Sequence, residues 1–190
     1  MAQKTYDSLR GDYKTPPQIY KPLLLLAEVQ KFDLDVCCSD ENIPAEKYNY
    51  IFYVDGLKTD WSGKCFMNPP FFYTEKWVKK AVKEVKRNIT TEVYCVLPAD
   101  RFETKFYQEN IIRNSHCMFA FLPGKQGFIV PGREKEPLKP SQKIAIVVFS
   151  RHAKQLAHNW NCVCLFNTLA ICGAGGGLSE KFFKRNSESL

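Results

Sequence analysis

The sequence lacks any long apolar run. Its longest candidate is PLLLLA at residues 22–27, whereas a helix that crosses a membrane needs about 18 to 20 apolar residues. The first residues, MAQKTYDSLRGD, are polar and contain no apolar core of a secretory signal. We therefore expect a protein with no membrane partner that works in an intracellular compartment.

The sequence also lacks the cysteine spacing of a disulfide scaffold or a zinc finger. Most of its 8 cysteines lie within apolar runs, which is typical of buried, reduced thiols. His158 with Cys162, Cys164 and Cys172 is an imaginable zinc site, but its C-x-C and x7 spacings do not match the usual finger patterns. We expect no bound metal.

The composition is that of a single globular domain with a core of its own. The chain has 190 residues, of which 45% are hydrophobic and 25% are charged. Its net charge is +7, from 27 basic and 20 acidic residues. A basic surface favours a polyanionic partner such as nucleic acid, although a solvated basic face is a common alternative.

Apolar periodicity predicts strands that alternate with helices. Strands are expected at 32–39, 48–54, 65–68, 92–98, 117–124 and 143–150, and helices at about 21–31, 74–88 and 103–114. Thr15 is predicted as a helix N-cap, with Pro16 in the first turn. Such an order is typical of an α/β fold with a mostly parallel sheet flanked by helices. The last two strands have no helix between them, so we expect an antiparallel edge strand.

The predicted helix at 74–88 has an apolar face and a basic face. The apolar face holds Trp77, Val78, Ala81, Val82 and Val85, and the basic face holds Lys76, Lys79, Lys80, Lys83 and Arg87. The basic face is either solvated or a nucleic-acid contact, and solvation is the more common case.

The stretch CFMNPPFFY at 65–73 ends a buried strand with unusual chemistry. The prolines fix a rigid corner, so the side-chain oxygen of Asn68 and the carbonyl of Pro69 are two acceptors in set positions. Phe71 adds a flat face for stacking. In α/β sheets, ligands bind beyond the carboxyl ends of the strands, which is where this corner is expected.

Two fixed acceptors beside an aromatic ring suit a planar group that bears an NH2, such as adenine. Accepting both N–H bonds draws the nitrogen towards tetrahedral geometry and frees its lone pair to attack an electrophilic methyl group. A base within duplex DNA must be flipped out to reach such a site. An alternative interpretation of the corner is a strand-ending turn with an aromatic packed beneath it.

Three blocks resemble one family of enzymes. They are YKTPPQIYKPL (13–23), FDLDVCCSDEN (32–42) and DGLKTDWSGKCFMNPPFFYTEKWVKKA (55–81), with weaker echoes in GKQGF and AIVVF. In this order they resemble the phage-type Dam family of DNA adenine methyltransferases, over roughly residues 12–150. The resemblance implies a class I, Rossmann-like methyltransferase fold, S-adenosylmethionine as cofactor and double-stranded DNA as substrate. We expect an arm at 1–13, the methyltransferase domain at 14–150 and a C-terminal extension at 151–190.

The resemblance also implies roles for individual residues. Asn68, Pro69 and Pro70 would hold the target amine, and Phe71 would stack on the flipped adenine. The cofactor would be bound by Thr15, Pro16, Asp35, Val36, Cys37 and Asp55, with Cys37 to Ser39 wrapping it and Asp40 or Asn42 on its ribose. The usual glycine-rich cofactor loop is missing, and DVCCSDEN stands in its place. Local alternatives are a turn aspartate for Asp35 and Asp55, and a helix cap for Thr15.

DNA contacts are expected from Arg101, Lys125 and Arg133, which lie after a predicted strand or in the Pro/Gly-rich loop. The small size of the chain leaves a homodimer or an accessory chain open. NPPF also occurs in methyltransferases that act on RNA adenine or a protein amide, so these acceptors are alternatives. A further alternative is a catalytically inactive DNA-binding module.

Overall fold

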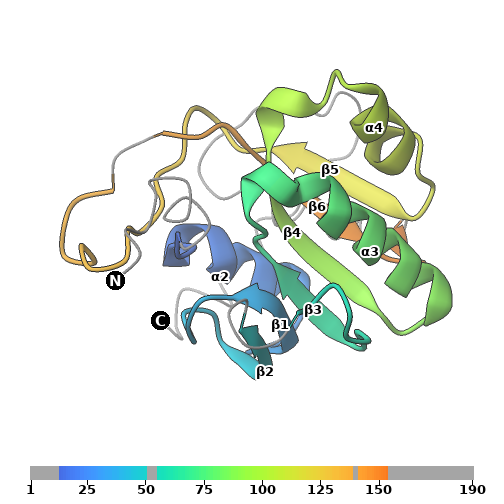
Figure 1. The fold of residues 1–190 in the computed structure, drawn as a ribbon, viewed down its shortest axis with the longest axis horizontal. Coiled ribbons are helices and arrows are strands. Elements are labelled where there is room, and N and C mark those ends of the chain that lie inside the picture. The colour runs from blue at the N-terminus through green and yellow to red at the C-terminus, as the bar shows by residue number, and fades with distance from the viewer. Residues whose placement is uncertain (1–12, 51–54, 139–140, 154–190) are drawn as a thin grey trace, which may run out of the picture.

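The computed structural model describes residues 13–50, 55–138 and 141–153. Here a 6-stranded sheet has the order β2-β1-β3-β4-β6-β5, with helices on both faces (Figure 1). The strands are β1 (Phe32–Cys38), β2 (Ala45–Tyr50), β3 (Lys64–Met67), β4 (Glu92–Pro98), β5 (Cys117–Phe121) and β6 (Ile144–Phe149). The helical elements are α2 (Pro17–Leu26), η1 (Phe71–Tyr73), α3 (Thr74–Arg87), η2 (Ala99–Arg101), α4 (Lys105–Tyr107) and η3 (Gln108–Ile112). The prediction of an α/β fold is confirmed.

The sheet combines parallel and antiparallel pairs. β1 is parallel to β2 and β3, and β3 is parallel to β4, whereas β6 is antiparallel to both β4 and β5. The expected antiparallel pair at one edge is present, but the reversed strand, β6, is not itself the edge strand. Every residue of β6 is buried, while β5 alternates towards solvent. The more apolar strand therefore takes the inner place.

Alternate residues of the central strands enter two separate cores. On β4, Val93 and Cys95 belong to the core under α3, while Tyr94 and Val96 belong to the core under α2. The helices contribute Trp77, Val78, Ala81 and Val85 from α3, and Ile19, Leu23 and Leu26 from α2. A strand buried on both faces must be apolar throughout, which explains the continuous apolar runs in the sequence.

Helix α2 begins earlier than the sequence predicts. It starts at Pro17, and its N-cap is Pro16, not Thr15. Pro16 makes no side-chain hydrogen bond that would cap this helix end. Proline suits the first helical position because the N–H it lacks would have no partner there. Pro22, which lies next to the predicted start at residue 21, is inside the helix.

Helix α2 also ends before the predicted Lys31. Glu28 has a left-handed backbone with φ 55°. The N–H groups of Glu28 and Val29 turn back onto the carbonyls of Leu25 and Leu24, each at 3.0 Å. This Schellman pattern usually uses glycine. With glutamate in that position, the sequence gives no stop signal.

Two further elements have bounds that differ from the prediction. The strand predicted at 48–54 begins at Ala45, and residues 51–54 lie outside the described part of the chain. In place of a helix at 103–114 there is a single α turn, α4, continued by the π turn η3. The amides of Asn110 and Asn114 bond to carbonyls four residues earlier, at 2.9 and 3.0 Å, in competition with regular helix bonds.

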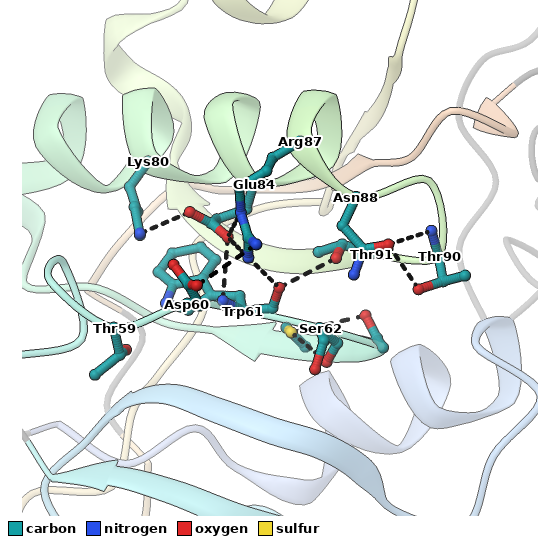
Figure 2. A network of polar contacts seen from close by, with 12 residues as sticks. Thr59, Asp60, Trp61, Ser62, Lys80, Glu84, Arg87, Asn88, Thr90 and Thr91 are labelled. Carbon is teal, nitrogen blue, oxygen red and sulfur yellow. Dashed lines mark hydrogen bonds and ion pairs between the residues drawn. The ribbon is translucent and has the colours of Figure 1, made fainter.

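A buried carboxylate, Glu84, joins α3 to the loop before β3 (Figure 2). It accepts hydrogen bonds from the Trp61 N–H at 3.1 Å, the Lys80 ammonium at 2.7 Å and the Arg87 guanidinium at 2.6 Å. Trp61 is fully buried and stacks on Trp77, with ring centroids 6.2 Å apart. Lys80 and Arg87 are thus held in a structural network. They do not extend the free basic face that the helix pattern predicts.

The ends of the chain are described only in part. Of the predicted arm and C-terminal extension, the structure describes Tyr13 and residues 151–153, and the imagined zinc ligands lie outside the described residues. Arg151 donates to the carbonyls of Val85 and Lys86 at the end of α3. The chain therefore still contacts the domain just past the predicted boundary at 150. No helix in the described ranges has the length and apolar character to cross a membrane.

Candidate active site

The corner at residues 68–71, here called the NPPF corner, directly follows β3. It lies at the edge where the parallel strands β1 and β4 also end. Its residues are buried or half-buried. The Tyr73 N–H bonds to the Pro70 carbonyl at 2.9 Å, and the Thr74 hydroxyl bonds to the Phe71 carbonyl at 2.8 Å. These bonds and the fixed φ of proline leave the corner little freedom.

The side-chain amide of Asn68 has a defined orientation. Its Nδ2 donates to the Thr15 hydroxyl oxygen at 3.0 Å and to the Tyr13 carbonyl at 3.4 Å. A carbonyl can only accept, so the NH2 end of the amide must face this side. Among the described residues, no donor bonds to Asn68 Oδ1 or to the Pro69 carbonyl. Two acceptors therefore remain available.

The ring of Phe71 packs edge-on against Phe128, with centroids 6.0 Å apart and planes at 87°. Phe128 is a core residue in the segment between β5 and β6. That segment leaves the carboxyl end of β5 and enters β6 beside the carboxyl end of β4, so it lies at the same edge as the corner. Sequence reasoning did not single out Phe128, although GKQGF contains it.

Asp35 is a buried carboxylate on β1, paired in register with Phe66 of β3. It is 3% exposed, and its Oδ1 accepts a hydrogen bond from the Cys37 N–H at 3.3 Å. Burial raises the pKa of Asp35 to about 7, against the opposing effect of that N–H. No cation pairs with it among the described residues. Such a carboxylate gains from a ligand that donates hydrogen bonds.

The raised pKa gives a testable pH dependence. We expect the unfolding free energy of the ligand-free protein to fall between about pH 5 and about pH 8, and Asp35→Asn to remove most of this fall. The folded state binds the Asp35 proton more tightly than the unfolded state, so raising the pH from the ordinary pKa of 3.8 to about 7 disfavours folding. The part of this range above pH 5 spans about two pH units, so at about 1.4 kcal/mol per unit the fall between pH 5 and pH 8 is at most about 3 kcal/mol.

Urea unfolding of both proteins at the two pH values measures this effect. Asp35→Asn is close in size and carries no charge, so its own pH dependence serves as the baseline. An equal fall in the wild type and the variant would show that Asp35 does not carry the effect.

The end of β1 meets the NPPF corner and a neighbouring turn. Val36 and Cys37 are buried, and the backbone N–H of Asn68 faces the Cys37 thiol. Burial raises the pKa of this thiol well above its ordinary value, so it stays protonated and is a poor nucleophile. A Cβ on Gly56 would lie 2.1 Å from the Val36 carbonyl oxygen, so only glycine fits there.

Asp55 is exposed at the start of that turn. Its carboxylate accepts the Leu57 N–H at 3.1 Å and pairs with Lys58 at 3.2 Å, and the Lys58 N–H bonds to the Asp55 carbonyl at 2.8 Å. The structure therefore shows the turn aspartate that the sequence left open as an alternative. A contact between Asp55 and a cofactor stays a prediction.

Residues 13–16, here called the N-terminal strap, cross this edge of the sheet. The backbone of Lys14 exchanges two hydrogen bonds with Ile129, each 3.0 Å long. Its ammonium lies 2.6 Å from Asp40 and 3.1 Å from Glu134, and these two carboxylates raise the pKa of Lys14. The strap thus joins the loop after β1 to the segment between β5 and β6.

Thr15 and Pro16 are buried within the strap. The Thr15 carbonyl accepts the side-chain amide of Asn42 at 2.8 Å, and its hydroxyl accepts the amide of Asn68. Asp40 keeps one buried oxygen, Oδ1, without a hydrogen-bond partner among the described residues. The predicted residues from all three sequence blocks are thereby brought to one place, apart from the exposed Asp55.

The predicted DNA-contacting residues are all exposed. Arg101 ends η2 directly after β4, and Lys125 and Arg133 lie between β5 and β6. Arg133 forms a long ion pair with Glu136 at 3.9 Å, whereas Arg101 has no ion pair within the described residues. They belong to elements that begin or end at the edge of the NPPF corner, but the structure does not bring them into contact with one another.

An exposed aromatic pair directly follows the corner and was missed by sequence reasoning. Phe72 is 83% exposed and packs edge-on against Tyr73, with centroids 5.3 Å apart. The Lys76 ammonium lies 5.3 Å from the centre of the Tyr73 ring. The signal was present in the sequence, because NPPFFY carries two more aromatics than the corner itself needs.

Comparison with known proteins supplies the family. A family model described as DNA N-6-adenine-methyltransferase (Dam) matches residues 2–171. The chain belongs to the Dam family. A Dam-family relative from Escherichia phage T1, named DNA N-6-adenine-methyltransferase, is 29% identical over 153 residues. The alignment covers 69% of this chain and 62% of the relative, so the chain spans less than two thirds of that protein.

No solved structure matches the chain. The Dam match extends beyond residues 12–150, the range expected from the motifs, and includes 151–171. The expectation that the last forty residues lie outside the family pattern is therefore wrong for this part. No NPPF-like motif marks that stretch, so motif reasoning had nothing to follow there.

Proposed function

We propose that this Dam-family chain transfers a methyl group from S-adenosylmethionine to the N6 amine of adenine in double-stranded DNA. The observation that supports this most directly is the orientation of Asn68. Its NH2 end is engaged by the strap, and its oxygen is left available beside the Pro69 carbonyl. Two acceptors in a rigid corner suit an exocyclic amine, which has two N–H bonds to donate.

We further propose a class I, Rossmann-like methyltransferase domain at about 14–150, with an arm and a C-terminal extension at its two ends. The strand order β2-β1-β3-β4-β6-β5, with β6 reversed between β4 and β5, supports this assignment. From β1 the chain adds β2 on one side and β3 on the other, so the strand order reverses its direction at β1. Ligands bind at such switch points, beyond the carboxyl ends of the strands. The NPPF corner lies at this edge.

The residues after β1 fit a cofactor rich in hydroxyl and ammonium groups. The Asp35 carboxylate is buried without a cation, and Asp40 has a buried oxygen that lacks a donor within the described residues. Val36 and Cys37 would add backbone groups, and the backbone of Thr15 and Pro16 would close the site from the strap. When bound, S-adenosylmethionine supplies an electrophilic methyl group on a sulfonium and leaves as a thioether.

The chain itself contributes position and polarity to the reaction. Asn68 Oδ1 and the Pro69 carbonyl accept the two N6–H bonds of adenine, while Phe71 stacks on the flipped base and is supported by Phe128. Held in this way, the N6 lone pair would point towards the electrophilic methyl group that the cofactor supplies, and the N6 proton would pass to water. Fixed dipoles and alignment of the reacting atoms provide the rate enhancement.

The test is a product analysis. Purified protein is incubated with unmethylated duplex DNA and methyl-labelled S-adenosylmethionine, and the DNA is digested to nucleosides. Label in N6-methyl-2′-deoxyadenosine is the expected result. Parallel reactions with RNA and with protein test the alternative acceptors, and label found only there would overturn the DNA assignment. Absence of cofactor binding in a thermal-shift assay, together with no methyl transfer, would support a catalytically inactive DNA-binding module.

Arg101 is expected to contact the DNA backbone. It is exposed at the carboxyl end of β4 and is free of ion pairs within the described residues. We expect Arg101→Gln to raise the KM for DNA roughly threefold to tenfold and to leave cofactor affinity unchanged. The slope of log affinity for DNA against log salt concentration should become shallower by about one, which corresponds to the loss of one phosphate contact.

Lys31→Gln is the matched control for Arg101→Gln. Lys31 precedes β1 at the opposite edge of the sheet and pairs with Glu46 at 2.7 Å. Its loss removes the same charge, so a general charge effect would appear in both variants. Equal changes in DNA affinity would therefore remove Arg101 from the proposed interface. Lys125 and Arg133 are also proposed as DNA contacts. Arg133 is a weaker test than Arg101, because it already pairs with Glu136.

Action on DNA requires a compartment that holds DNA, which is the proposed site of function. The expectation of a homodimer or an accessory chain stays a prediction.

The methylation assay described above would also give the recognised base sequence, if the methylated positions were mapped in a DNA of mixed sequence.

A further inference from the structure

An asparagine that must accept hydrogen bonds faces an orientation problem. The two ends of its amide are nearly equal in size, but one end accepts and the other donates. If the Asn68 amide turned by half a rotation, an NH2 group would face the target amine. Both groups would then be donors, and the amine would not be bound. A site built on asparagine therefore needs a partner that tells the two ends apart.

Two groups of the strap do this together: the Tyr13 carbonyl, which can only accept, selects the NH2 end, and the Thr15 hydroxyl holds that end in place. The hydroxyl oxygen lies 3.0 Å from Asn68 Nδ2, and the Tyr13 carbonyl lies 3.4 Å from the same nitrogen. The carbonyl forces NH2 to this side, and the shorter bond to the hydroxyl anchors it. Both acceptors come from the strap, which is far from Asn68 in sequence.

The hydroxyl is itself well fixed. Thr15 is 2% exposed, and its carbonyl accepts the Asn42 amide at 2.8 Å. The preceding Lys14 is held through its backbone to Ile129 and through its ammonium to Asp40. A partner held from several directions can transmit its position to the amide. Thr15 is not needed as a helix cap, since Pro16 occupies that position without a side-chain bond.

We propose that Thr15 is a positioning residue, whose hydroxyl holds the Asn68 amide with Oδ1 towards the target amine. This inference rests on the proposed function. It differs from the role that the motif resemblance implies for Thr15, which is contact with the cofactor.

Thr15→Val and Thr15→Ser separate the two roles. Valine has the shape of threonine without the hydroxyl, and serine keeps the hydroxyl. We expect Thr15→Val to lower kcat about tenfold, with cofactor affinity and the KM for DNA within about twofold, and Thr15→Ser to stay within about twofold of wild type in every constant. A parallel loss of cofactor affinity in Thr15→Val, or no rescue by serine, would overturn the proposal.

A double-mutant cycle adds a second criterion. In Asn68→Asp the two carboxylate oxygens are equivalent, so no orientation has to be selected. We expect Thr15→Val to lower kcat clearly less in this background than in the wild type. An equal loss in both backgrounds would mean that Thr15 acts through general packing. Thermal unfolding of each variant confirms that folded proteins are compared.

A readout without activity keeps this inference separate from the proposed function. The side-chain NH2 signals of Asn68 in ¹⁵N-labelled protein can be assigned by their absence in Asn68→Ala. We expect slowed solvent exchange of these protons in the wild type and in Thr15→Ser, and faster exchange in Thr15→Val. If the wild type methylates no DNA, the proposed function fails. The exchange measurement still shows whether the Thr15 hydroxyl holds the Asn68 amide. Unchanged exchange in Thr15→Val would refute it.

Discussion

Asn68→Ala is expected to lower kcat for adenine methylation roughly 100- to 1,000-fold, which is the size of effect seen when one fixed polar contact to the reacting group is lost. The variant keeps the Pro69 carbonyl but lacks the oxygen that would accept the second N6–H bond. It also loses the amide's bonds to Thr15 and Tyr13, although the strap stays held through Lys14 and through the Thr15 carbonyl. Initial rates at saturating DNA and cofactor measure the loss.

Two further variants show whether the loss reflects acceptor chemistry. Asn68→Asp retains an acceptor in the same place, and we expect it to recover a measurable part of the rate. Asn88→Ala is the matched control, because Asn88 is also half-buried but lies at the end of α3, before β4. Cofactor affinity should stay within about twofold of wild type in all three. An Asn68→Ala enzyme with a wild-type kcat would exclude the NPPF corner as the site of reaction.

Glu84→Ala is expected to lower the unfolding free energy by about 3 to 4 kcal/mol, the largest stability effect we anticipate for a single side chain here. Its carboxylate is 1% exposed and joins Lys80, Arg87 and the Trp61 N–H. Alanine would leave that N–H buried without an acceptor and the largely buried Lys80 without its counter-ion. Urea unfolding monitored by tryptophan fluorescence measures the change, since Trp61 stacks on Trp77 beside the network.

Glu75→Ala and Glu84→Gln are the controls for this network. Glu75 is an exposed glutamate in the first turn of the same helix, so its loss should change stability by less than about 1 kcal/mol. Glu84→Gln keeps an acceptor for Trp61 but loses the charge. Equal destabilisation by Glu84→Ala and Glu75→Ala would show that the network adds nothing to stability.

The pH dependence of Glu84 gives a further check. Burial acts to raise the pKa of Glu84, but Lys80, Arg87 and the Trp61 N–H outweigh it and hold the pKa below its ordinary value of 4.5. A lowered folded-state pKa stabilises the protein above the ordinary value, and this stability is lost as the pH falls below it. The stability difference between the wild type and Glu84→Gln should therefore shrink in acid.

The network also bears on the proposed active site. It fixes the loop that follows the 55–58 turn, and the indole N–H of Trp61 bonds to the Gly56 carbonyl at 2.9 Å. Gly56 in turn lies against the Val36 carbonyl at the end of β1. Loss of Glu84 is thus expected to loosen one wall of the region where the cofactor is proposed to bind.

Elements with a local cause can be predicted from the order of the amino acids alone. The apolar runs of β4 and β6 and the amphipathic pattern of α3 predict these elements nearly to the residue. The prolines of the NPPF corner set the end of β3. The order of the three motif blocks was enough to indicate the family. Each block is a short run of residues, so it can be recognised without knowing how the rest of the chain folds.

Other features depend on contacts between residues far apart in the chain, so they become visible only in the folded protein. β6 lies inside β5 because it is the strand that can be buried on both faces. Glu84 is buried on α3 and holds Lys80 and Arg87 of the predicted basic face, because the loop at Trp61 supplies a backbone N–H to it. Thr15 looked like a helix cap, but 53 residues separate it from the Asn68 amide that its hydroxyl contacts. Local patterns describe the partners a residue has within a few positions of the chain, and a hydrogen bond across that distance exists only once the sheet has brought its two ends together.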